Sequence, residues 1–540
     1  MNPISRLTVV PSVGCILLAL LGCSRRETPV EAGIRTQTLL VGNAAEPQDL
    51  DPDIITVYTD SHIAYALFEG LTKLDAKTSL AAPALAESWD VSPDGKVYTF
   101  HLRPSARWSD GDPVTAGDFV YSFHRLLSPA FAGLYSYMLW PIKNAEAFNA
   151  GKLTDFNQVG VKAIDNVTLQ VSLEKPTPYL PALASHTTWL PVQKKTIEKF
   201  GRMDEKGTKW TRPGNLVGNG AFMLADWNPN ARIVVIKNPR YWDAANTRLN
   251  RIEFYPIEKP DIEDLNFRSG QLHTTYQLPM TKIEYYRSHV PPELGVDPVL
   301  STFYFFLNVT RPPFDNVKLR QALCYGIDRD AISRSVTDGV YPPAHCLTAP
   351  NCGGYTSLTQ VPDDFEKARQ LLSEAGYPGG RGLPPIEVQC FESETQLRMT
   401  EAVQAMWLKE LGVHITIAQL ETKTLYQNQQ TKDYTMAFSG WIADYADPNT
   451  FLGTMVTGGG NNYAGWSNKD FDSLIDQASN TADNSKRMDL FQKAEAILLG
   501  EAPVIPLYFQ PNVYAISPAV KGWTTTVVGF HEWNRIWLEK

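Results

Sequence analysis

The chain has 540 residues, of which 43% are hydrophobic and 20% charged, and its formal net charge at pH 7 is −9. An acidic surface repels phosphates, so this charge argues against nucleic acid as a partner. A chain of this length is also too large for one hydrophobic core, and we expect it to divide into two or three domains.

The N-terminus has the pattern of a secretory signal. Arg6 is followed by the apolar stretch VVPSVGCILLAL, and LLG then precedes Cys23. The pattern resembles the bacterial lipobox, in which the cysteine becomes the lipidated first residue of the mature chain; the alternatives are a short core helix or a signal anchor. The stretch is shorter than the ~20 residues that a membrane-spanning helix needs. We therefore predict a signal peptide over residues 1–22, lipidation of Cys23 and a polar tether over residues 23–37.

No later stretch of the sequence is long and apolar enough to cross a bilayer. We therefore expect the body to lie outside the cytoplasm, on the periplasmic side or at the cell surface, and to be held at the membrane only by lipid on Cys23.

Four cysteines remain in the body. Cys346 and Cys352 bracket the short loop CLTAPNC, which a disulfide could close in an oxidising compartment; the alternative is two unpaired thiols. Cys324 lies in a helical pattern and Cys390 in a strand pattern, so we expect both to be buried as small hydrophobic residues.

The segment from Asp90 to Leu127 has clear local signals. The turn SPDG leads into the alternating strand VYTFHL at 97–102, and the turn SDGDP leads to a helix that Thr115 and Asp118 cap together. Residues 212–259 then show short β runs between Asn, Pro and Gly turns, which is typical of a mixed sheet.

From residue 299 the pattern changes to strands alternating with helices. The strand VLSTFYFFLN is followed by the helical segment NVKLRQALCYGIDRDAISRSV and by PDDFEKARQLLSEAG, where Asp363 and Glu366 form a capping pair. IEVQCF, TQLRMTEAVQAMWLKELG and VHITIAQL then predict a βαβ unit. Residues 299 to about 507 therefore form a separate α/β lobe in this interpretation.

Signatures of enzymes are missing from the sequence. It contains no His-Glu-x-x-His pair, no Gly-x-Ser-x-Gly elbow and no phosphate loop, since TGGGNN lacks the following Lys-Ser/Thr. GNLVGNGAF is better explained as a turn before a strand than as a nucleotide loop. The histidines are scattered, and His101 and His124 sit within a strand and a helix. We predict a protein that is not an enzyme and holds no metal and no cofactor.

The stretch SGWIADYADPNTF, residues 439–451, places Asp444 between Trp441 and Tyr445 in a run that is otherwise apolar or small. A carboxylate held against aromatic faces loses hydration and needs a cation or several donors. No Lys or Arg lies in this stretch, so the partner of Asp444 must come from elsewhere.

Several stretches resemble one family, the extracellular solute-binding proteins of the oligopeptide and dipeptide type (solute-binding family 5), which serve ABC peptide importers. EPQDLDP at 46–52 and LFEGL at 67–71 resemble its opening, and LAESWDVSPDGKVYTFHLRPSARWSDGDPVTAGDFVYSF at 85–123 is close to its signature block. NPRYWD, RSGQLH, RQALCYGIDRDAI and SGWIADYADPNTF follow in the family's order. The resemblance runs from about Glu46 to the C-terminus and is nearer to oligopeptide receptors than to nickel- or haem-binding relatives.

The resemblance implies an α/β, two-lobed periplasmic-binding-protein-like fold with a hinge between the lobes and an extra domain on the N-terminal lobe. The expected limits are 38–70, 192–300 and 508–540 for the N-terminal lobe, 71–191 for the extra domain and 301–507 for the C-terminal lobe.

The resemblance also implies the ligand-binding residues. The aspartate of the Trp-x-x-Asp-Tyr motif, here Asp444, would pair with the α-ammonium of a peptide. Gly440 and Ile442 would supply main-chain hydrogen bonds, and Trp441 would form the wall of a side-chain pocket. Two tyrosines of the N-terminal lobe, Tyr135 and Tyr58, would contact the ligand from the other side. The alternatives are a core position for Trp441, a turn for Gly440, and a helix cap or surface carboxylate for Asp444.

The sequence departs from the family at the opposite end of the site. Phe438 and Gln429 stand where arginines are found, and Gln396 stands where a histidine is found. An uncharged pocket cannot neutralise the C-terminal carboxylate of a peptide, so the fate of that terminus is open.

Three further departures are Thr56 for an acidic residue, Thr422 for a pocket tryptophan, and Ser301 with Ile442 at the two positions of the family's cystine. Because both halves of the cystine are missing together, the bridge is interpreted as dispensable.

The resemblance thus implies a lipid-anchored, monomeric receptor that binds peptides of roughly two to five or more residues and passes them to an ABC permease. A second hypothesis is a dedicated amine-bearing ligand such as a muropeptide, motivated by the altered carboxylate end. A secreted peptide hydrolase and a periplasmic chaperone are further alternatives.

Overall fold

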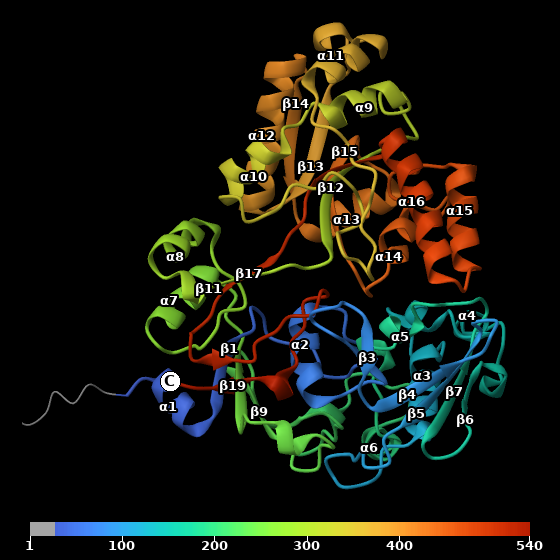
Figure 1. Cartoon of the computed structure of the whole chain (residues 1–540), viewed down its shortest axis with the longest axis vertical. Coiled ribbons are helices and arrows are strands. Elements are labelled where there is room, and N and C mark those ends of the chain that lie inside the picture. Colours follow the sequence, from blue (N-terminus) through green and yellow to red (C-terminus); the bar gives the residue numbers. More distant parts are fainter. Residues whose placement is uncertain (1–26) are drawn as a thin grey trace, which may run out of the picture.

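Two lobes, each built around its own sheets, stack on each other in the computed structural model (Figure 1). The structure describes residues 27–540; the predicted signal peptide and Cys23 lie outside them. The first lobe contains strands β1–β11 and β17–β19, and the second contains β12–β16. The chain passes between them twice, just before β12 and just after β16. The α/β, two-lobed fold predicted above is confirmed.

The first lobe is centred on a mixed four-stranded sheet in the order β1-β10-β9-β8, in which only the β1–β10 pair is parallel. Its strands are β1 (Thr38–Gly42), β8 (Phe222–Asn228), β9 (Arg232–Lys237) and β10 (Arg251–Tyr255). Three two-stranded sheets accompany it: β2 (Thr72–Leu74) with β3 (Ala81–Pro83), β11 (Leu294–Asp297) with β17 (Asn512–Ala515), and β18 (Val520–Lys521) with β19 (Trp537–Leu538). Its helices are α1 (Pro29–Thr36), α2 (Tyr58–Leu67), α6 (Lys194–Phe200), α7 (Pro260–Arg268) and α8 (Ile283–His289).

A second, antiparallel sheet extends the first lobe, in the order β4-β5-β7-β6. It contains β4 (Ala86–Val91), β5 (Val97–Leu102), β6 (Val161–Ala163) and β7 (Thr168–Ser172), with helices α3 (Ala116–Leu127), α4 (Ala145–Asn149) and α5 (Leu180–Leu183). Thr115 and Asp118 form the predicted capping box of α3. One hydrophobic core joins both sheets, since Phe254 of β10 and Phe100 of β5 belong to the same buried cluster. The predicted residue limits of the lobes and of the extra domain stay predictions.

The second lobe has a five-stranded sheet in the order β14-β13-β15-β12-β16. Its strands are β12 (Ser301–Leu307), β13 (Ile386–Phe391), β14 (Ile415–Leu420), β15 (Met436–Ile442) and β16 (Val504–Tyr508). Its helices are α9 (Val317–Tyr325), α10 (Arg329–Thr337), α11 (Phe365–Glu374), α12 (Glu394–Leu411), α13 (Thr422–Thr431), α14 (Asn449–Leu452), α15 (Lys469–Ser479) and α16 (Asn484–Glu501).

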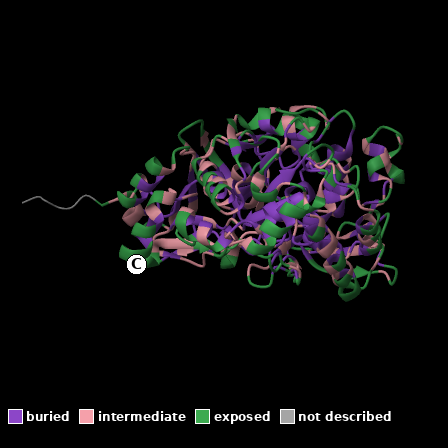
Figure 2. Cartoon of the chain, turned by 90° about the horizontal axis from the view of Figure 1, so that it is seen from above, coloured by how far each residue is buried: buried purple, intermediate pink, exposed green. Residues whose placement is uncertain are grey.

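Alternate residues of β12 fill two cores on opposite faces of this sheet. Phe305 and Leu307 belong to one buried cluster, and Tyr304 and Phe306 to the other, as expected for a strand buried on both sides. Buried residues (purple in Figure 2) fill the interior, whereas many outer helix surfaces are exposed. Within residues 27–540, no helix combines the length and apolar character that crossing a bilayer requires.

The tether predicted over residues 23–37 is wrong for its C-terminal part. Residues Pro29–Thr36 form α1, which opens with a capping box of Thr28 and Glu31. Gln37 Nε2 then donates to the carbonyl of Leu538 (2.7 Å). The helix is therefore attached to the C-terminal strand of the body, and its polar composition reflects an exposed outer face.

The disulfide between Cys346 and Cys352 is not formed, and both are buried free thiols. Cys346 belongs to one buried core of the second lobe and Cys352 to the other. The carboxylate of Glu495 holds the intervening loop instead, because it accepts from the N–H groups of Leu347 (3.0 Å) and Thr348 (2.7 Å). Of the two alternatives that the sequence left open, a bridge and two unpaired thiols, the structure has the unpaired thiols.

Two helix predictions are also corrected. The segment predicted as one helix from 316 is divided into α9 and α10, because Asp328 caps a new helix. The cap of α11 is Asp364 rather than Asp363; Asp363 forms an ion pair with Arg329 instead.

Candidate ligand-binding site

Two cavities lie between the lobes, and each includes residues at or near the end of β15. The larger, of about 630 Å³, is lined by Tyr58 and Tyr276 from the first lobe and by Ile442 from the second. The smaller, of about 260 Å³, is lined by Tyr137 from the first lobe and by Trp441 and Asp444 from the second. The sequence motif around Asp444 therefore faces the cleft, with neighbouring residues directed into different cavities.

The carboxylate of Asp444 has no hydrogen bond and no ion pair with any of the described residues, although the residue is half-buried. Its backbone N–H donates to Thr450 Oγ1 (3.3 Å), and Trp441 Nε1 donates to the same oxygen (3.2 Å). One hydroxyl thus fixes both residues. Burial raises the pKa of Asp444 to about 7, which is the expected effect of desolvation without a compensating charge.

Three tyrosines of the first lobe lie near this carboxylate: Tyr58 at the start of α2, Tyr135 and Tyr137. Burial and then the charge of Asp444 raise the pKa of each, for Tyr135 to about 12. All three therefore remain neutral hydroxyls at physiological pH. Tyr58 stacks on Phe530 with ring centroids 5.1 Å apart, which fixes the ring beside the cleft.

The edge of β15 is open next to Asp444. β13 pairs with β15 only at Met436 and Ala437, whereas β12 pairs along its whole length. Gln429 Nε2 donates to the carbonyl of Phe438 (3.1 Å), so that carbonyl points away from β12. Because backbone groups alternate along a strand, those of Gly440 and Ile442 point the same way. The edge therefore presents main-chain donors and acceptors to the cleft.

The structure shows where these residues lie. Gly440 lies inside β15 rather than in a turn, and a Cβ there would come within 2.6 Å of the Phe303 ring. Trp441 is half-buried: it lines a cavity and also packs against one of the buried cores of the second lobe. Asp444 caps no helix, because Pro448 precedes α14. The cavity linings thus include Asp444, Trp441, Ile442 and Tyr58, whereas Gly440 and Tyr135 lie outside the lining of both cavities.

The three residues that stand where relatives have arginines or a histidine lie in different surroundings. Phe438 is fully buried against Phe305 (centroids 5.3 Å apart), and Gln429 is fully buried beneath the strand edge. Gln396 lines the larger cavity. Ser301 and Ile442, at the positions of the missing cystine, are direct partners in the β12–β15 register. Ser301 Oγ instead donates to the carbonyl of Gln510 (2.6 Å), which ties β12 to the second connection between the lobes.

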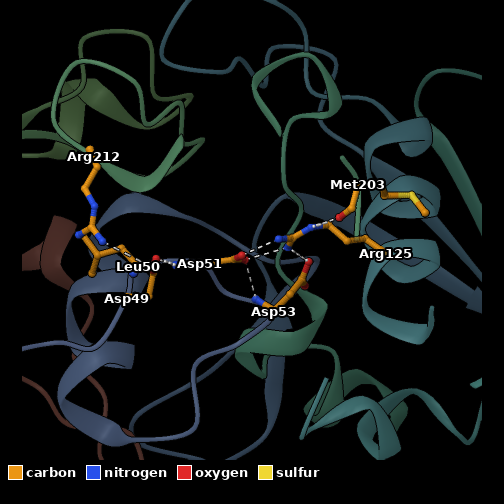
Figure 3. Close-up of polar contacts among 7 residues, drawn as sticks. All are labelled: Asp49, Leu50, Asp51, Asp53, Arg125, Met203 and Arg212. Atoms are coloured by element: carbon orange, nitrogen blue, oxygen red, sulfur yellow. Dashed lines mark hydrogen bonds and ion pairs between the residues drawn. The ribbon is translucent and has the colours of Figure 1, made fainter. Parts of the chain in front are cut away.

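A buried ion cluster fixes the segment that leads to Tyr58 (Figure 3). Arg125 of α3 donates through Nη2 to Asp51 Oδ2 (2.6 Å) and through Nη1 to Asp53 Oδ2 (2.5 Å). Its Nε donates to the carbonyl of Met203 (2.8 Å). Burial, opposed by Arg125, raises the pKa of Asp53 to about 7. The EPQDLDP motif is thereby attached to α3, and α2 begins five residues after Asp53.

Sequence reasoning missed Tyr137, Thr450 and the Arg125 cluster. Tyr137 lies two residues after Tyr135 in the same aromatic run, which was the available signal. Neither the pairing of Arg125, more than 70 residues from its partners, nor the hydroxyl of Thr450 leaves a local signal.

Comparison with known proteins identifies the family. The model for bacterial extracellular solute-binding proteins, family 5 (middle region), matches residues 81–463. The chain belongs to solute-binding protein family 5. Because members of this family are solute-binding proteins, the prediction of a binding protein rather than an enzyme is confirmed, as is an extracytoplasmic location. Within residues 27–540, no group of His, Cys, Asp or Glu side chains is arranged to hold a metal ion.

Three family members show how far the likeness extends. The periplasmic oligopeptide-binding protein OppA of Escherichia coli K12 is 38% identical over 530 residues, which is 95% of each chain. The structure of the E. coli murein tripeptide-binding protein MppA has a TM-score of 0.78 and 31% identity, covering 93% of this chain and 98% of that one. The OppA of Haemophilus influenzae in complex with RPPGFSPFR has a TM-score of 0.77 and 32% identity, covering 94% and 99%.

Proposed function

We propose that this family 5 protein is a lipid-anchored receptor that captures oligopeptides in the cleft between its lobes and delivers them to an ABC permease. The observation that carries the proposal is the half-buried carboxylate of Asp444 in the cleft, which has no partner in the described part of the chain. A peptide α-ammonium would supply the missing cation, since a desolvated carboxylate is stabilised by a charged donor. The names of the related oligopeptide-binding proteins support the same ligand class.

The open edge of β15 supports main-chain recognition. An extended peptide whose N-terminus pairs with Asp444 would add as a strand along Ile442 and Gly440, so its side chains would not decide binding. At about 3.3 Å per residue, the free part of the edge, from Ile442 to Gly440, accommodates roughly three residues, because the carbonyl of Phe438 already accepts from Gln429. Trp441, Tyr58 and Tyr135 would contact the ligand from the two sides. This accords with a ligand length of roughly two to five residues or more.

The proposed attachment to the membrane, through lipid on Cys23, rests on the sequence. The lipobox-like pattern before Cys23 supports lipidation of that residue, and a monomer is proposed because one chain provides both walls of the cleft. Delivery to a permease follows from the role of solute-binding proteins as receptors.

A second ligand class is a murein peptide or another dedicated amine-bearing ligand. The uncharged, fully buried Phe438 and Gln429 favour it, and so does the likeness to a murein tripeptide-binding protein.

Native mass spectrometry of the protein purified without unfolding tests these proposals. A ladder of co-purified masses that fragment as peptides of mixed sequence is the expected result. A single defined mass would indicate the dedicated ligand instead. An empty protein that also ignores a peptide library would defeat peptide binding.

A further inference from the structure

Little chain lies between the folded body and the proposed lipid on Cys23. Glu27, the first residue that the structure describes, is only four positions after Cys23. Four residues span at most about 14 Å, even when they are fully extended. Thr28 caps α1, and Gln37 ties the end of α1 to the C-terminal strand of the body. A lipid on Cys23 would therefore hold the start of α1 within about 14 Å of the membrane surface.

This limit determines which side of the first lobe faces the membrane. α7 ends beside the start of α1, because the N–H of Val30 donates to the carbonyl of Gly270 (3.1 Å). α8 packs on α7, where the hydroxyl of Tyr286 donates to Asp264 Oδ1 (2.6 Å). Figure 1 shows α1, α7 and α8 together on one flank of the first lobe. The anchored flank, as we call these three helices, is thus the part of the body closest to the lipid.

The anchored flank has apolar side chains that face solvent. Ile262 and Leu265 of α7 are 47% and 55% exposed, and Tyr285 of α8 is 45% exposed. Ile262 and Leu265 are three positions apart and share one face of their helix, whereas Phe267 is buried in a core. Scattered exposed apolar residues are ordinary on a protein surface. A pair on one helix face beside the attachment point of a lipid has a bilayer within reach to cover it.

The charges on the anchored flank largely cancel. Three of its basic residues pair with acidic neighbours: Arg35 with Glu27, Arg268 with Asp264, and Arg287 with Glu284. Lys259, just before α7, is exposed between the acidic Glu258 and Asp261. Arg25 and Arg26 follow Cys23 in the sequence, and basic residues beside a lipid anchor are attracted to anionic headgroups. Electrostatics therefore does not oppose contact between this flank and a membrane.

We infer, on the basis of the proposed lipid anchor, that the anchored flank lies on the bilayer, with Ile262 and Leu265 in the lipid headgroup region. Two side chains bury too little surface to bind a membrane alone. The lipid on Cys23 makes their contact intramolecular, which raises the effective concentration of the bilayer beside them. α7 starts at the rim of the larger cavity, which Pro260 and Asp261 line. That rim is therefore one nine-residue helix, about 13 Å, from the attachment point.

Quenching by nitroxide lipids tests the inference. The full chain, with its lipid verified by mass spectrometry, is reconstituted into vesicles of phosphatidylcholine and phosphatidylglycerol that include lipids with a nitroxide headgroup. A fluorophore is attached to Ser269→Cys, an exposed position at the end of α7. It is directed to this thiol, because the four cysteines of the described chain are buried.

Ser373→Cys is the matched control position. Ser373 is also exposed and lies near the end of a helix, α11, which is at the far end of the second lobe (Figure 1). We expect nitroxide quenching about threefold stronger at position 269 than at position 373, because only the anchored flank lies in the headgroup region.

Ile262→Gln combined with Leu265→Gln tests the apolar contact separately from the tether. Both side chains are exposed, so the circular dichroism and peptide affinity of the variant should match those of wild type. Quenching at Ser269→Cys should fall to about a third, because the apolar contact with lipid is lost. Leu358→Gln with Leu408→Gln is the control pair, since both leucines are exposed but lie in the second lobe, and quenching should not change.

Equal quenching at positions 269 and 373 would overturn the inference, as would be expected if a protein partner covers the flank instead. Quenching that survives the loss of Ile262 and Leu265 would show that the tether alone brings the flank near the membrane, and would also overturn it. A mass spectrum without lipid on Cys23 would defeat the proposed anchor and the inference with it. Peptide binding is measured independently, so all of these results leave the receptor function standing.

Discussion

Two carboxylate sites, one in each lobe, differ in whether a cation accompanies them. In the first lobe, Asp51 and Asp53 share the guanidinium of Arg125, whose nitrogens all donate to the chain. In the second lobe, Asp444 faces the cleft with no partner among the described residues. A folded protein retains an unpaired desolvated carboxylate at a cost in stability. The comparison therefore distinguishes an ion cluster that stabilises the fold from a carboxylate that is available to a ligand.

The clearest contrast between a paired and an unpaired carboxylate lies within one motif, ADYAD at residues 443–447. Three residues after Asp444, Asp447 is fully buried and receives two bonds from Arg487, at 2.5 and 2.7 Å. Arg487 also lies over the ring of Tyr179 of the first lobe, 4.9 Å from its centroid. Among residues 27–540, an arginine thus pairs with the second aspartate of ADYAD and none pairs with the first.

The largest expected effect is the loss of the paired cluster. Arg125→Met leaves Asp51 and Asp53 buried without a cation, which should lower the free energy of unfolding by about 5 kcal/mol or more. Urea unfolding followed by circular dichroism measures the change. The control is Arg212→Met, because Arg212 is 44% exposed and 3.9 Å from Asp49; it should cost less than about 1 kcal/mol. Similar losses of unfolding free energy in the two variants would mean that the buried cluster does not stabilise the fold.

Removing the unpaired carboxylate should instead affect binding. Asp444→Ala should lose roughly 3–5 kcal/mol of peptide binding free energy, because the ligand ammonium would then be buried without its partner. N-acetylated peptides should bind wild type poorly for the same reason. Titration calorimetry with free and acetylated forms of one peptide measures both effects. Wild type that binds the two forms equally would exclude an ion pair with Asp444.

Much of this contrast could be anticipated from residue types. A carboxylate between Trp441 and Tyr445, with no Lys or Arg nearby, indicated that Asp444 needs a cation from outside its own segment. Local elements such as the capping box of Thr115 and Asp118 also followed, because their signals lie within a few residues. The two lobes were expected mainly from the resemblance to the family.

Other features depend on contacts between distant segments. The partner of Asp51 and Asp53 is Arg125, which no local pattern indicates. Cys346 and Cys352 are close in sequence but belong to opposite cores, so their spacing was misleading. The segment before β1 was predicted to be a tether because its composition is polar, although several residues of α1 are partly buried against the body. Spacing along the chain predicts turns and caps well, but it does not predict which face a side chain takes.

A smaller effect should appear when pH is varied. In the ligand-free protein, burial raises the pKa of Asp444 to about 7, whereas an ammonium partner would lower it. Binding therefore requires release of a proton below pH 7, and affinity should fall roughly 15-fold from pH 7.0 to 5.5. The nearby Tyr135 stays neutral in this range, because its pKa is raised to about 12.

Calorimetry in two buffers of different ionisation enthalpy would detect the released proton. Asp444→Asn should show weak binding that does not vary across this range. A wild-type affinity that is constant from pH 7.0 to 5.5 would contradict an elevated pKa for Asp444.

The smallest expected effect is a gain in stability, whereas most substitutions destabilise a protein. Because the pKa of Asp444 in the folded protein is raised from 3.8 to about 7, its ionisation destabilises the ligand-free fold. That cost is absent below pH 3.8 and fully present above pH 7. Asp444→Asn should therefore raise the free energy of unfolding by about 1 kcal/mol at pH 8, and the gain should disappear as the pH falls toward 4. Urea unfolding at the two pH values measures it.

Asp447→Asn is the matched comparison, because it removes the charge that pairs with the buried Arg487. It should destabilise the protein by about 3 kcal/mol or more at pH 8. The two substitutions, three residues apart, would then change the free energy of unfolding in opposite directions. Both changes would have one physical cause, the presence or absence of a cation beside the carboxylate. If Asp444→Asn were also destabilising, Asp444 would have a stabilising partner within the protein, and its assignment to the ligand would fail.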